Sequence, residues 1–176
     1  GNRNPLLYKN IGADGIKTGF LTVEKYSLAS SIKVGERRLT AVGSGFETRN
    51  SRSKESIKIL TWGLRSFDTI QIAKKNTVIA NLEVWLGKKN KVEVSVNEDI
   101  YLTVPKRKKS IVKAFIEYTT PIRAPIEKGD KLGSLSVFVE EKLIKKVDIF
   151  SNEKIKRTNI FSRILKSFNF LVWGDA

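Results

Sequence analysis

The stretch that decides the fold is Asp14-Gly15-Ile16-Lys17-Thr18-Gly19-Phe20. It has the character of a β-strand, but a cation, a hydroxyl group and two glycines are crowded into it. Gly19 removes a side chain where another backbone could approach closely. A solvated lysine and threonine beside a turn glycine would also explain the Lys17-Thr18-Gly19 triplet, because a three-residue pattern recurs by chance. The rest of the chain decides between these interpretations.

The segments that follow predict two more strands. Residues 26–34 and 37–45 are rich in apolar and β-branched residues, and Gly35-Glu36 separates them with a turn signal. Two such runs around a short glycine-containing turn are typical of a β-hairpin. With the Lys17 strand they predict an antiparallel unit of three strands.

A helix is expected next. Thr48 or Asn50 can cap its start, and it is expected to run through Phe67. Apolar residues at steps of three and four place one face against the sheet. These residues are Ile57, Leu60, Leu64 and Phe67.

The sequence pattern changes after residue 68. Apolar and polar residues now alternate with a period of two, and turn residues separate these runs. Short strands at this spacing predict a small all-β sandwich or barrel. The expected strands are 92–96, 100–104, 114–118, 135–139 and 147–149. The overall class is therefore α+β. The expected parts are 1–68, with strands and a helix, 69–151, a β domain, and 152–176, a linker and helix.

The last segment predicts an amphipathic helix with a bulky apolar face and a basic polar face. Such a pattern is typical of a helix that lies in a membrane interface, although docking on the protein itself or on a partner remains an alternative. The apolar face is formed by Ile160, Phe161, Ile164, Leu165, Phe168, Leu171, Val172 and Trp173.

The amino-acid composition limits the kinds of site and partner that the protein can have. The 176 residues carry 33 Lys and Arg against 18 Asp and Glu, a net charge of +15, and contain neither cysteine nor histidine. Disulfides and thiolate or imidazole metal sites are thereby excluded, and no metal or cofactor is expected. The positive charge favours a polyanionic partner such as an anionic membrane surface, or is a solubilising surface without a partner. Nucleic acid is not expected, because the aromatic residues form no exposed stacking row.

Taken together, the sequence resembles the low-molecular-mass penicillin-binding proteins, the serine-type D-alanyl-D-alanine carboxypeptidases with a C-terminal β domain and a membrane-surface anchor. The resemblance covers nearly the whole chain. It is carried by residues 14–19, Thr61-Trp62-Gly63, residues 100–105 and Ala124-Pro125. It implies that residues 1–68 are the C-terminal part of a transpeptidase-like catalytic domain.

Two motifs of this family precede the Lys-Thr-Gly triplet, a Ser-x-x-Lys that holds the nucleophile and a Ser-x-Asn. We expect both to lie upstream of Gly1. Three later matches, Ser30-Ser-Ile-Lys33, Ser51-Arg-Ser-Lys54 and Ser95-Val-Asn97, follow the triplet and are interpreted as chance matches. The chain alone is therefore predicted to be inactive.

The resemblance also implies roles for the remaining residues. Lys17 would supply positive potential, Thr18 and Arg52 would bind the substrate's terminal carboxylate, and Gly19 would leave room for its backbone. The backbone N–H of Phe20 would be one of two oxyanion donors. An arginine in the first turn of a helix opposes the helix dipole, which favours a specific role for Arg52.

The implied function is removal of the terminal D-alanine from peptidoglycan stem peptides through an acyl-serine, at the periplasmic face of the bacterial inner membrane. β-Lactams would acylate the intact enzyme. The alternative is a non-catalytic membrane-surface binding module with a basic β domain. An incomplete sheet would expose an edge and an apolar face, so self-association is also expected.

Overall fold

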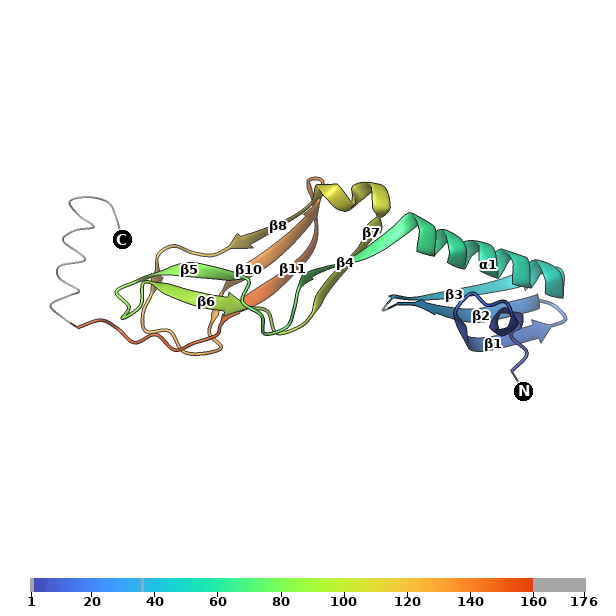
Figure 1. The fold of residues 1–176 in the computed structure, drawn as a ribbon, viewed down its shortest axis with the longest axis horizontal. Coiled ribbons are helices and arrows are strands. Elements are labelled where there is room, and N and C mark those ends of the chain that lie inside the picture. The colour runs from blue at the N-terminus through green and yellow to red at the C-terminus, as the bar shows by residue number, and fades with distance from the viewer. Residues whose placement is uncertain (1, 36, 160–176) are drawn as a thin grey trace. The chain divides into compact units, whose positions relative to one another are not determined.

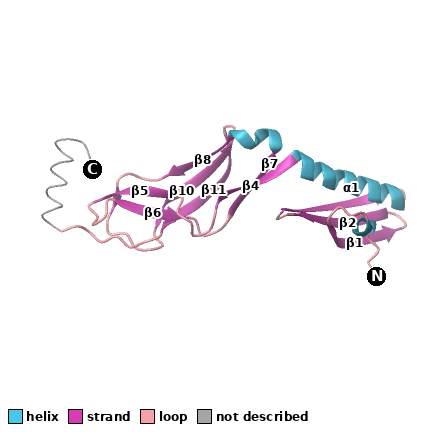
Figure 2. Cartoon of the chain, in the orientation of Figure 1, coloured by secondary structure: helices cyan, strands magenta, loops and turns pink. Residues whose placement is uncertain are grey.

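The computed structural model describes residues 2–35 and 37–159. Figure 1 shows these residues as one run of strands interrupted by a single long helix. They form two compact units. Within the described residues, the N-terminal unit covers positions 2–69 with Thr103–Lys106, and the β unit covers Ile70–Leu102 with positions 107–159. The described residues are mostly β with one α-helix, as the sequence predicted (Figure 2).

The N-terminal unit contains the predicted three-stranded antiparallel sheet. Its strands are β1 (Ala13–Leu21), β2 (Lys25–Val34) and β3 (Arg37–Phe46), in the order β1-β2-β3. Lys17 lies opposite Ala29, and Ser30 lies opposite Ala41. β1 is therefore an edge strand within the described part of the chain.

The helix α1 (Arg49–Ser66) packs along β2 and β3. Leu60 from α1 joins Leu28 and Ile32 from β2 in the core, together with Leu6 from the 3-10 helix η1 (Pro5–Tyr8). These four side chains are at most 2% exposed. Burial of one such aliphatic side chain contributes about 1.5–3 kcal/mol, so the apolar stripe of α1 and η1 holds this layer to the sheet.

Specific contacts set both ends of α1. Thr48 is the N-cap, as expected: its Oγ1 accepts a 3.0 Å hydrogen bond from the N–H of Ser51, and the Ser51 hydroxyl accepts one from the N–H of Thr48, which completes a capping box. At the other end, the guanidinium of Arg37 donates to the carbonyl oxygens of Gly63, at 2.9 Å, and of Phe67. The expected extension of the helix through Phe67 is wrong, because Phe67 has extended dihedrals (φ −124°, ψ 148°) and begins the next strand.

The chain after α1 has more strands than predicted. The expected strands near 92–96, 100–104, 114–118, 135–139 and 147–149 are all present, and β4, β5 and the short β9 are additional. The strands are β4 (Phe67–Ala73), β5 (Ala80–Trp85), β6 (Lys91–Ser95), β7 (Ile100–Pro105), β8 (Val112–Glu117), β9 (Ile122–Arg123), β10 (Lys131–Val139) and β11 (Lys142–Ser151). A 3-10 helix, η2 (Lys106–Ile111), precedes β8.

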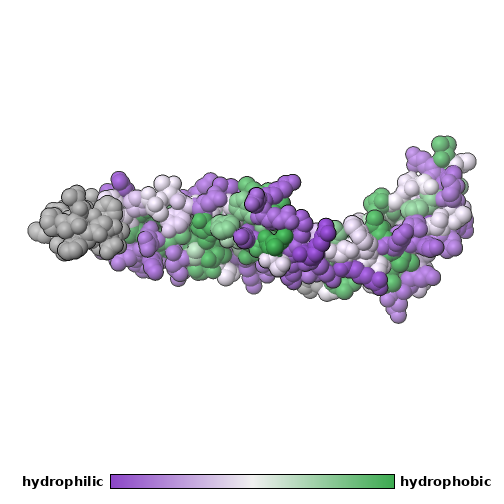
Figure 3. All heavy atoms as spheres, turned by 90° about the horizontal axis from the view of Figure 1, so that it is seen from above, coloured by the Kyte–Doolittle hydropathy of each residue, from purple (hydrophilic) through white to green (hydrophobic). Residues whose placement is uncertain are grey.

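Hydrogen bonds join six of these strands in the order β8-β10-β11-β6-β5-β9, and β4 pairs with β7. Alternate residues point inward: Val92 and Val94 on β6 are fully buried, as is Ile149 on β11. This alternation, with polar residues outward, is expected of antiparallel strands that cover a core on one face. Figure 3 accordingly shows hydrophilic side chains over much of the visible surface, with apolar patches between them.

The predicted membrane-facing helix, residues 160–173, lies outside the described residues. No helix among the described residues is long and apolar enough to cross a membrane.

Candidate functional site

The Lys17-Thr18-Gly19-Phe20 stretch lies on the edge strand β1 and begins at the midpoint of the strand. The side chains of Lys17 and Phe20 are exposed, while Thr18 and Gly19 are half-buried. The Lys17 ammonium donates a 2.9 Å hydrogen bond to the carbonyl oxygen of Thr18. The stretch is thus a strand that pairs with β2 on one side, and within the described residues no strand pairs with its other side.

The N-terminal segment fixes the backbone of β1 just before Lys17. The side-chain amide of Asn4 donates to the carbonyl oxygen of Gly15 at 2.6 Å, and its oxygen accepts from the N–H of Leu6 at 3.0 Å. Asn2 donates to the carbonyl oxygen of Ile16 at 2.9 Å. The Asn4 side chain is completely buried, so these two hydrogen bonds take the place of water.

Packing within the sheet explains why position 19 is a glycine. Gly19 lies opposite Ser27 on β2, and a Cβ placed on it would lie 2.4 Å from the Ser27 Oγ. The glycine therefore prevents a clash with Ser27. Room for a ligand backbone at this position stays a prediction.

The first turn of α1 brings two arginines to the same place. Arg49 and Arg52 are three residues apart and so share a helix face. Their guanidinium carbons lie 6.0 Å and 5.7 Å from the centre of the Tyr26 ring on β2, within cation–π range. The Tyr26 ring in turn contacts the Phe20 ring, with centroids 4.7 Å apart. An aromatic pair thus connects the edge strand to the helix start.

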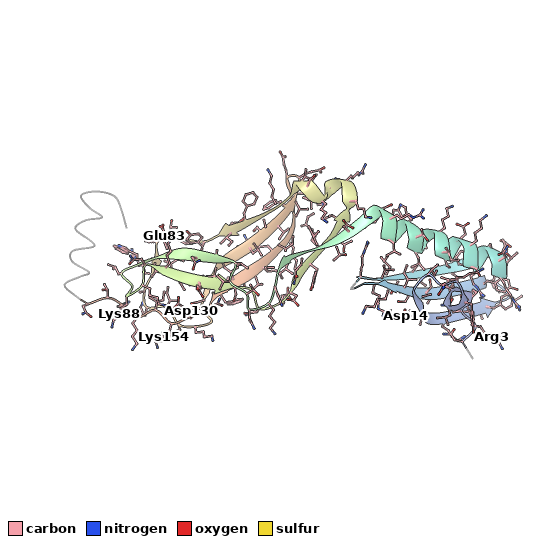
Figure 4. All side chains as sticks on the ribbon, viewed as in Figure 1. Arg3, Asp14, Glu83, Lys88, Asp130 and Lys154 are labelled. Atoms are coloured by element: carbon pink, nitrogen blue, oxygen red, sulfur yellow. The ribbon has the colours of Figure 1, made fainter. Side chains whose placement is uncertain are left out.

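These groups line one hollow of about 680 Å³ in the N-terminal unit. Its lining combines all five predicted site residues with three that the sequence did not single out. The lining residues are Arg3, Lys17, Thr18, Gly19, Phe20, Tyr26, Arg49 and Arg52. Figure 4 labels Arg3 on the segment before η1. Four of the eight are cations and, in the part of the chain that the structure describes, none is acidic.

Arg52 is the most unusual of these cations. It is 7% exposed, and its Nε has no hydrogen-bond partner within the described protein. Burial lowers the pKa of its guanidinium from the usual value, the positive charge of Arg49 lowers it further, and Tyr26 acts in the opposite direction. A buried guanidinium with an open donor and a cationic neighbour is suited to bind an anion, which would relieve both costs.

The three serines interpreted as chance matches have structural roles. Ser51 belongs to the capping box of α1. Ser30 is buried on β2 and donates a 3.3 Å hydrogen bond to the carbonyl oxygen of Ala41, and Ser95 is buried on β6 and donates to the side chain of Asn152. Their hydroxyls are therefore already used within the fold, which supports the interpretation.

Two of the three missed lining residues had a signal in the sequence. Arg49 is one helical turn before Arg52, which places both on one face. Tyr26 follows a short turn after β1, so the hairpin register puts it opposite Phe20. Arg3 had no such signal, because it lies in a segment without regular period. Among the described residues there is also no cluster of acids that could hold a metal ion.

A comparison with protein families identifies the relatives. The family model described as penicillin-binding protein 5, C-terminal domain, matches residues 67–157, slightly more than half of the chain. The chain belongs to this family. It is homologous to the C-terminal region of D-alanyl-D-alanine carboxypeptidases, which confirms the resemblance seen in the sequence.

Individual relatives agree with this assignment. The D-alanyl-D-alanine carboxypeptidase DacA of Escherichia coli (strain K12) is 32% identical over 93% of this chain and 41% of that protein. DacF of Bacillus subtilis (strain 168) is 30% identical over 92% of this chain and 42% of that protein. The structure of penicillin-binding protein 5 from Haemophilus influenzae superposes with a TM-score of 0.75 at 32% identity, and the match covers 88% of this chain and 46% of that one. The chain thus spans less than half the length of these relatives.

Proposed function

We propose that the intact protein is a D-alanyl-D-alanine carboxypeptidase that removes the terminal D-alanine from peptidoglycan stem peptides. This chain would contribute the substrate-binding strand of the active site, the β domain and the membrane-surface segment. The observation that carries the proposal is the hollow in which β1 and the first turn of α1 meet, because it joins the Lys-Thr-Gly stretch to a buried arginine.

In this proposal the substrate peptide lies along the open edge of β1 as an additional antiparallel strand. Its terminal carboxylate is held by the hydroxyl of Thr18 and the guanidinium of Arg52, whose planar donors match a carboxylate. Lys17 adds positive potential. The backbone N–H of Phe20 donates to the oxyanion that develops on the scissile carbonyl.

The nucleophile is proposed to come from sequence upstream of Gly1, where a Ser-x-x-Lys and a Ser-x-Asn would precede Lys17. The serine of the intact enzyme attacks the peptide carbonyl and releases D-alanine, and water then hydrolyses the acyl-serine. Penicillins acylate the same serine. We propose the parts 1–68, 69–151 and 152–176 as the end of the catalytic domain, the β domain and the linker with its membrane-surface helix.

Two measurements test this function on the chain itself. A fluorescent penicillin is expected to leave the chain unlabelled, and covalent labelling would contradict the structural roles given to its serines, Ser51 first. Acetyl-D-Ala-D-Ala is expected to shift the backbone amide NMR signals of residues 17–20, and Arg52→Gln to weaken this binding about tenfold or more, since it removes a charge-assisted contact. Absence of any shift at the highest soluble peptide concentration would refute the proposed site.

A membrane-surface role is proposed for the C-terminal segment, at the periplasmic face of the inner membrane. The net charge of +15 favours an anionic surface. The chain is expected to float with anionic liposomes and to lose this binding when residues 159–176 are removed. Retention of binding after the truncation would instead assign it to the β domain, as in the alternative of a non-catalytic binding module.

Self-association is proposed for the chain on its own. An apolar hollow of about 640 Å³ lies between β3 and α1, and it is lined by Val42, which is 79% exposed, and Trp62, which is 55% exposed. Exposed apolar side chains at a sheet edge favour association. Light scattering should give a mass above that of a monomer, and Val42→Lys should reduce it. A monomer at all concentrations would contradict this expectation.

A further inference from the structure

A second hollow lies in the β unit, where the β5–β6 hairpin meets the segment before β9. It has a volume of about 430 Å³, which is within the range of small-molecule sites. Figure 4 labels one of its lining residues, Glu83 on β5. Three stretches of the chain contribute to this hollow: Glu83 and Trp85 from β5, Asn90 and Lys91 at the start of β6, and Thr120 and Pro121 before β9. The function proposed above uses none of them.

Trp85 gives the hollow an aromatic surface that the sheet holds in place. Arg123 on β9 is its partner in the sheet register, and the guanidinium carbon of Arg123 lies 5.0 Å from the centre of the indole ring, within cation–π range. The carbonyl oxygen of Trp85 accepts a 3.1 Å hydrogen bond from the N–H of Ala124. The Trp85 side chain is half-buried, so part of the ring stays accessible. A ring that is ordered before binding reduces the entropy lost when a ligand binds.

Polar side chains of several kinds surround this aromatic surface. Glu83 and Lys91 are directly opposite each other on β5 and β6, so they lie on the same face of the sheet. Thr120 adds a hydroxyl group. Within the described residues, none of these three side chains forms an ion pair or a hydrogen bond with another part of the protein. The hollow therefore offers a ligand both donors and acceptors.

This combination of groups narrows the class of ligand. Among the lining residues one cation faces one acid, a balance that favours an uncharged ligand over a phosphate group, and a single carboxylate is a poor metal site. β5 pairs with β6 on one side and with β9 on the other, so a peptide finds no open strand edge here. A sugar ring fits the remaining chemistry, because its C–H face packs on an aromatic ring while its hydroxyls, at the perimeter, both donate and accept hydrogen bonds.

The geometry points to a carbohydrate subsite in the β unit that binds the glycan strand of peptidoglycan through its N-acetylated sugars. One sugar ring lies on the Trp85 indole, its hydroxyls bond to Glu83 and Thr120, and the Lys91 ammonium donates to a hydroxyl or acetamido oxygen. The choice of N-acetylated sugars rests on the proposed function. The β domain thereby holds the glycan of the same polymer whose stem peptide is bound beside β1.

Tri-N-acetylchitotriose, titrated into the 176-residue chain, tests this subsite through the NMR signals of the Trp85 indole N–H and the Thr120 amide. We expect saturable shifts of both signals. Maltotriose, which lacks acetamido groups, should bind about fivefold more weakly, since it forgoes about one hydrogen bond. Thr120→Val should weaken binding about threefold to tenfold for the same reason, and Trp85→Ala about tenfold or more, as for an aromatic hot spot. Trp62→Phe, a matched control in the N-terminal unit, should leave binding unchanged.

The outcomes separate this inference from the proposed function. The inference is overturned if the trisaccharide gives no saturable shift, or if its binding survives both Thr120→Val and Trp85→Ala. Equal binding of maltotriose would overturn the assignment to N-acetylated sugars. Acetyl-D-Ala-D-Ala that shifts the Trp85 and Thr120 signals as strongly as the trisaccharide would show a peptide site instead. The proposed function is judged by the signals of residues 17–20 with acetyl-D-Ala-D-Ala, so either result can fail while the other stands.

Discussion

Asn4 connects the N-terminal segment to the strand that carries the candidate site, and its replacement by alanine is the most informative perturbation of the N-terminal unit. Its carboxamide has no exposed surface and makes two hydrogen bonds, 2.6 Å to the Gly15 carbonyl and 3.0 Å from the Leu6 N–H. Gly15 and Leu6 are themselves buried. Asn4→Ala therefore leaves one acceptor and one donor without partners.

Each buried polar group that loses its partner costs about 1–3 kcal/mol. The two groups together predict that Asn4→Ala lowers the free energy of unfolding of this unit by about 2–6 kcal/mol. A loss of that size is a large part of the stability of a small domain. At a urea m-value of about 1–2 kcal/mol/M the unfolding midpoint should fall by roughly 1–6 M.

Urea unfolding followed by the fluorescence of Trp62 measures this change in the N-terminal unit, in a background with Trp85 and Trp173 replaced by phenylalanine. Asn2→Ala is the matched control. It removes two 2.9 Å hydrogen bonds, one donated to the Ile16 carbonyl of β1 and one accepted from the Asn4 N–H, but the Asn2 side chain is exposed, so water can replace its groups. If Asn4→Ala costs no more than Asn2→Ala, burial of the carboxamide does not anchor β1.

A second substitution at this position tests the direction of the hydrogen bonds. Asn4→Asp keeps the acceptor for the Leu6 N–H but directs a carboxylate oxygen at the Gly15 carbonyl. Burial and this repulsion should raise the pKa of the new carboxyl in the folded state, so the folded state binds more protons than the unfolded state. The loss in free energy of unfolding caused by Asn4→Asp should therefore become smaller as the pH is lowered through that raised pKa. A loss that does not depend on pH would contradict the assigned geometry.

Three further predictions follow from contacts in the N-terminal unit. Arg37→Gln should lower the free energy of unfolding by about 1–3 kcal/mol, because it leaves the last carbonyls of α1 unpaired, and a change below 0.5 kcal/mol by urea unfolding would be evidence against this role. The guanidinium of Arg38 holds the pKa of the Asp14 carboxyl below its usual value. The stabilisation from this pair is therefore present at neutral pH and is lost as the pH falls through that lowered pKa. Arg38→Gln should raise the pKa of Asp14 in an NMR titration, and an unchanged pKa would exclude the pair. Gly19→Ala should lower the free energy of unfolding by about 1 kcal/mol, because the new methyl group would clash with the Ser27 hydroxyl. In a double-mutant cycle, Ser27→Ala should remove most of that cost. Additive effects of the two substitutions would show that the clash is not with Ser27.

Local patterns predicted much of the fold. The hairpin around residue 35 and the capped helix after Thr48 follow from turn and capping chemistry, which act between near neighbours in sequence. The end of the helix was misplaced because Phe67 continues the apolar spacing of α1, while the bond from Arg37, thirty residues away, fixes the end one residue earlier. β5 was missed although Leu82 and Val84 alternate with polar residues.

The candidate site was predictable to the extent that it lies on one strand and one helix turn. The Lys17 triplet came from its motif and Arg52 from the resemblance to the family, and the structure places them around one hollow. The roles of these residues stay predictions. Arg3 reaches the hollow only because the segment before η1 is tied back to β1 by asparagine hydrogen bonds. Such long-range contacts leave no periodic signal in the sequence.

The contact between Arg37 and the end of α1 also has a mechanical consequence. Arg37 is the first residue of β3, and its guanidinium holds the carbonyl oxygens of Gly63 and Phe67, where the chain leaves the helix. Helix ends ordinarily fray first, because their last carbonyls lack partners. Because of these hydrogen bonds from Arg37, tension applied to the chain beyond Phe67 acts on the β2–β3 hairpin as well as on the last turn of α1. A pull on the chain is thereby transmitted to the hairpin before it can unwind α1.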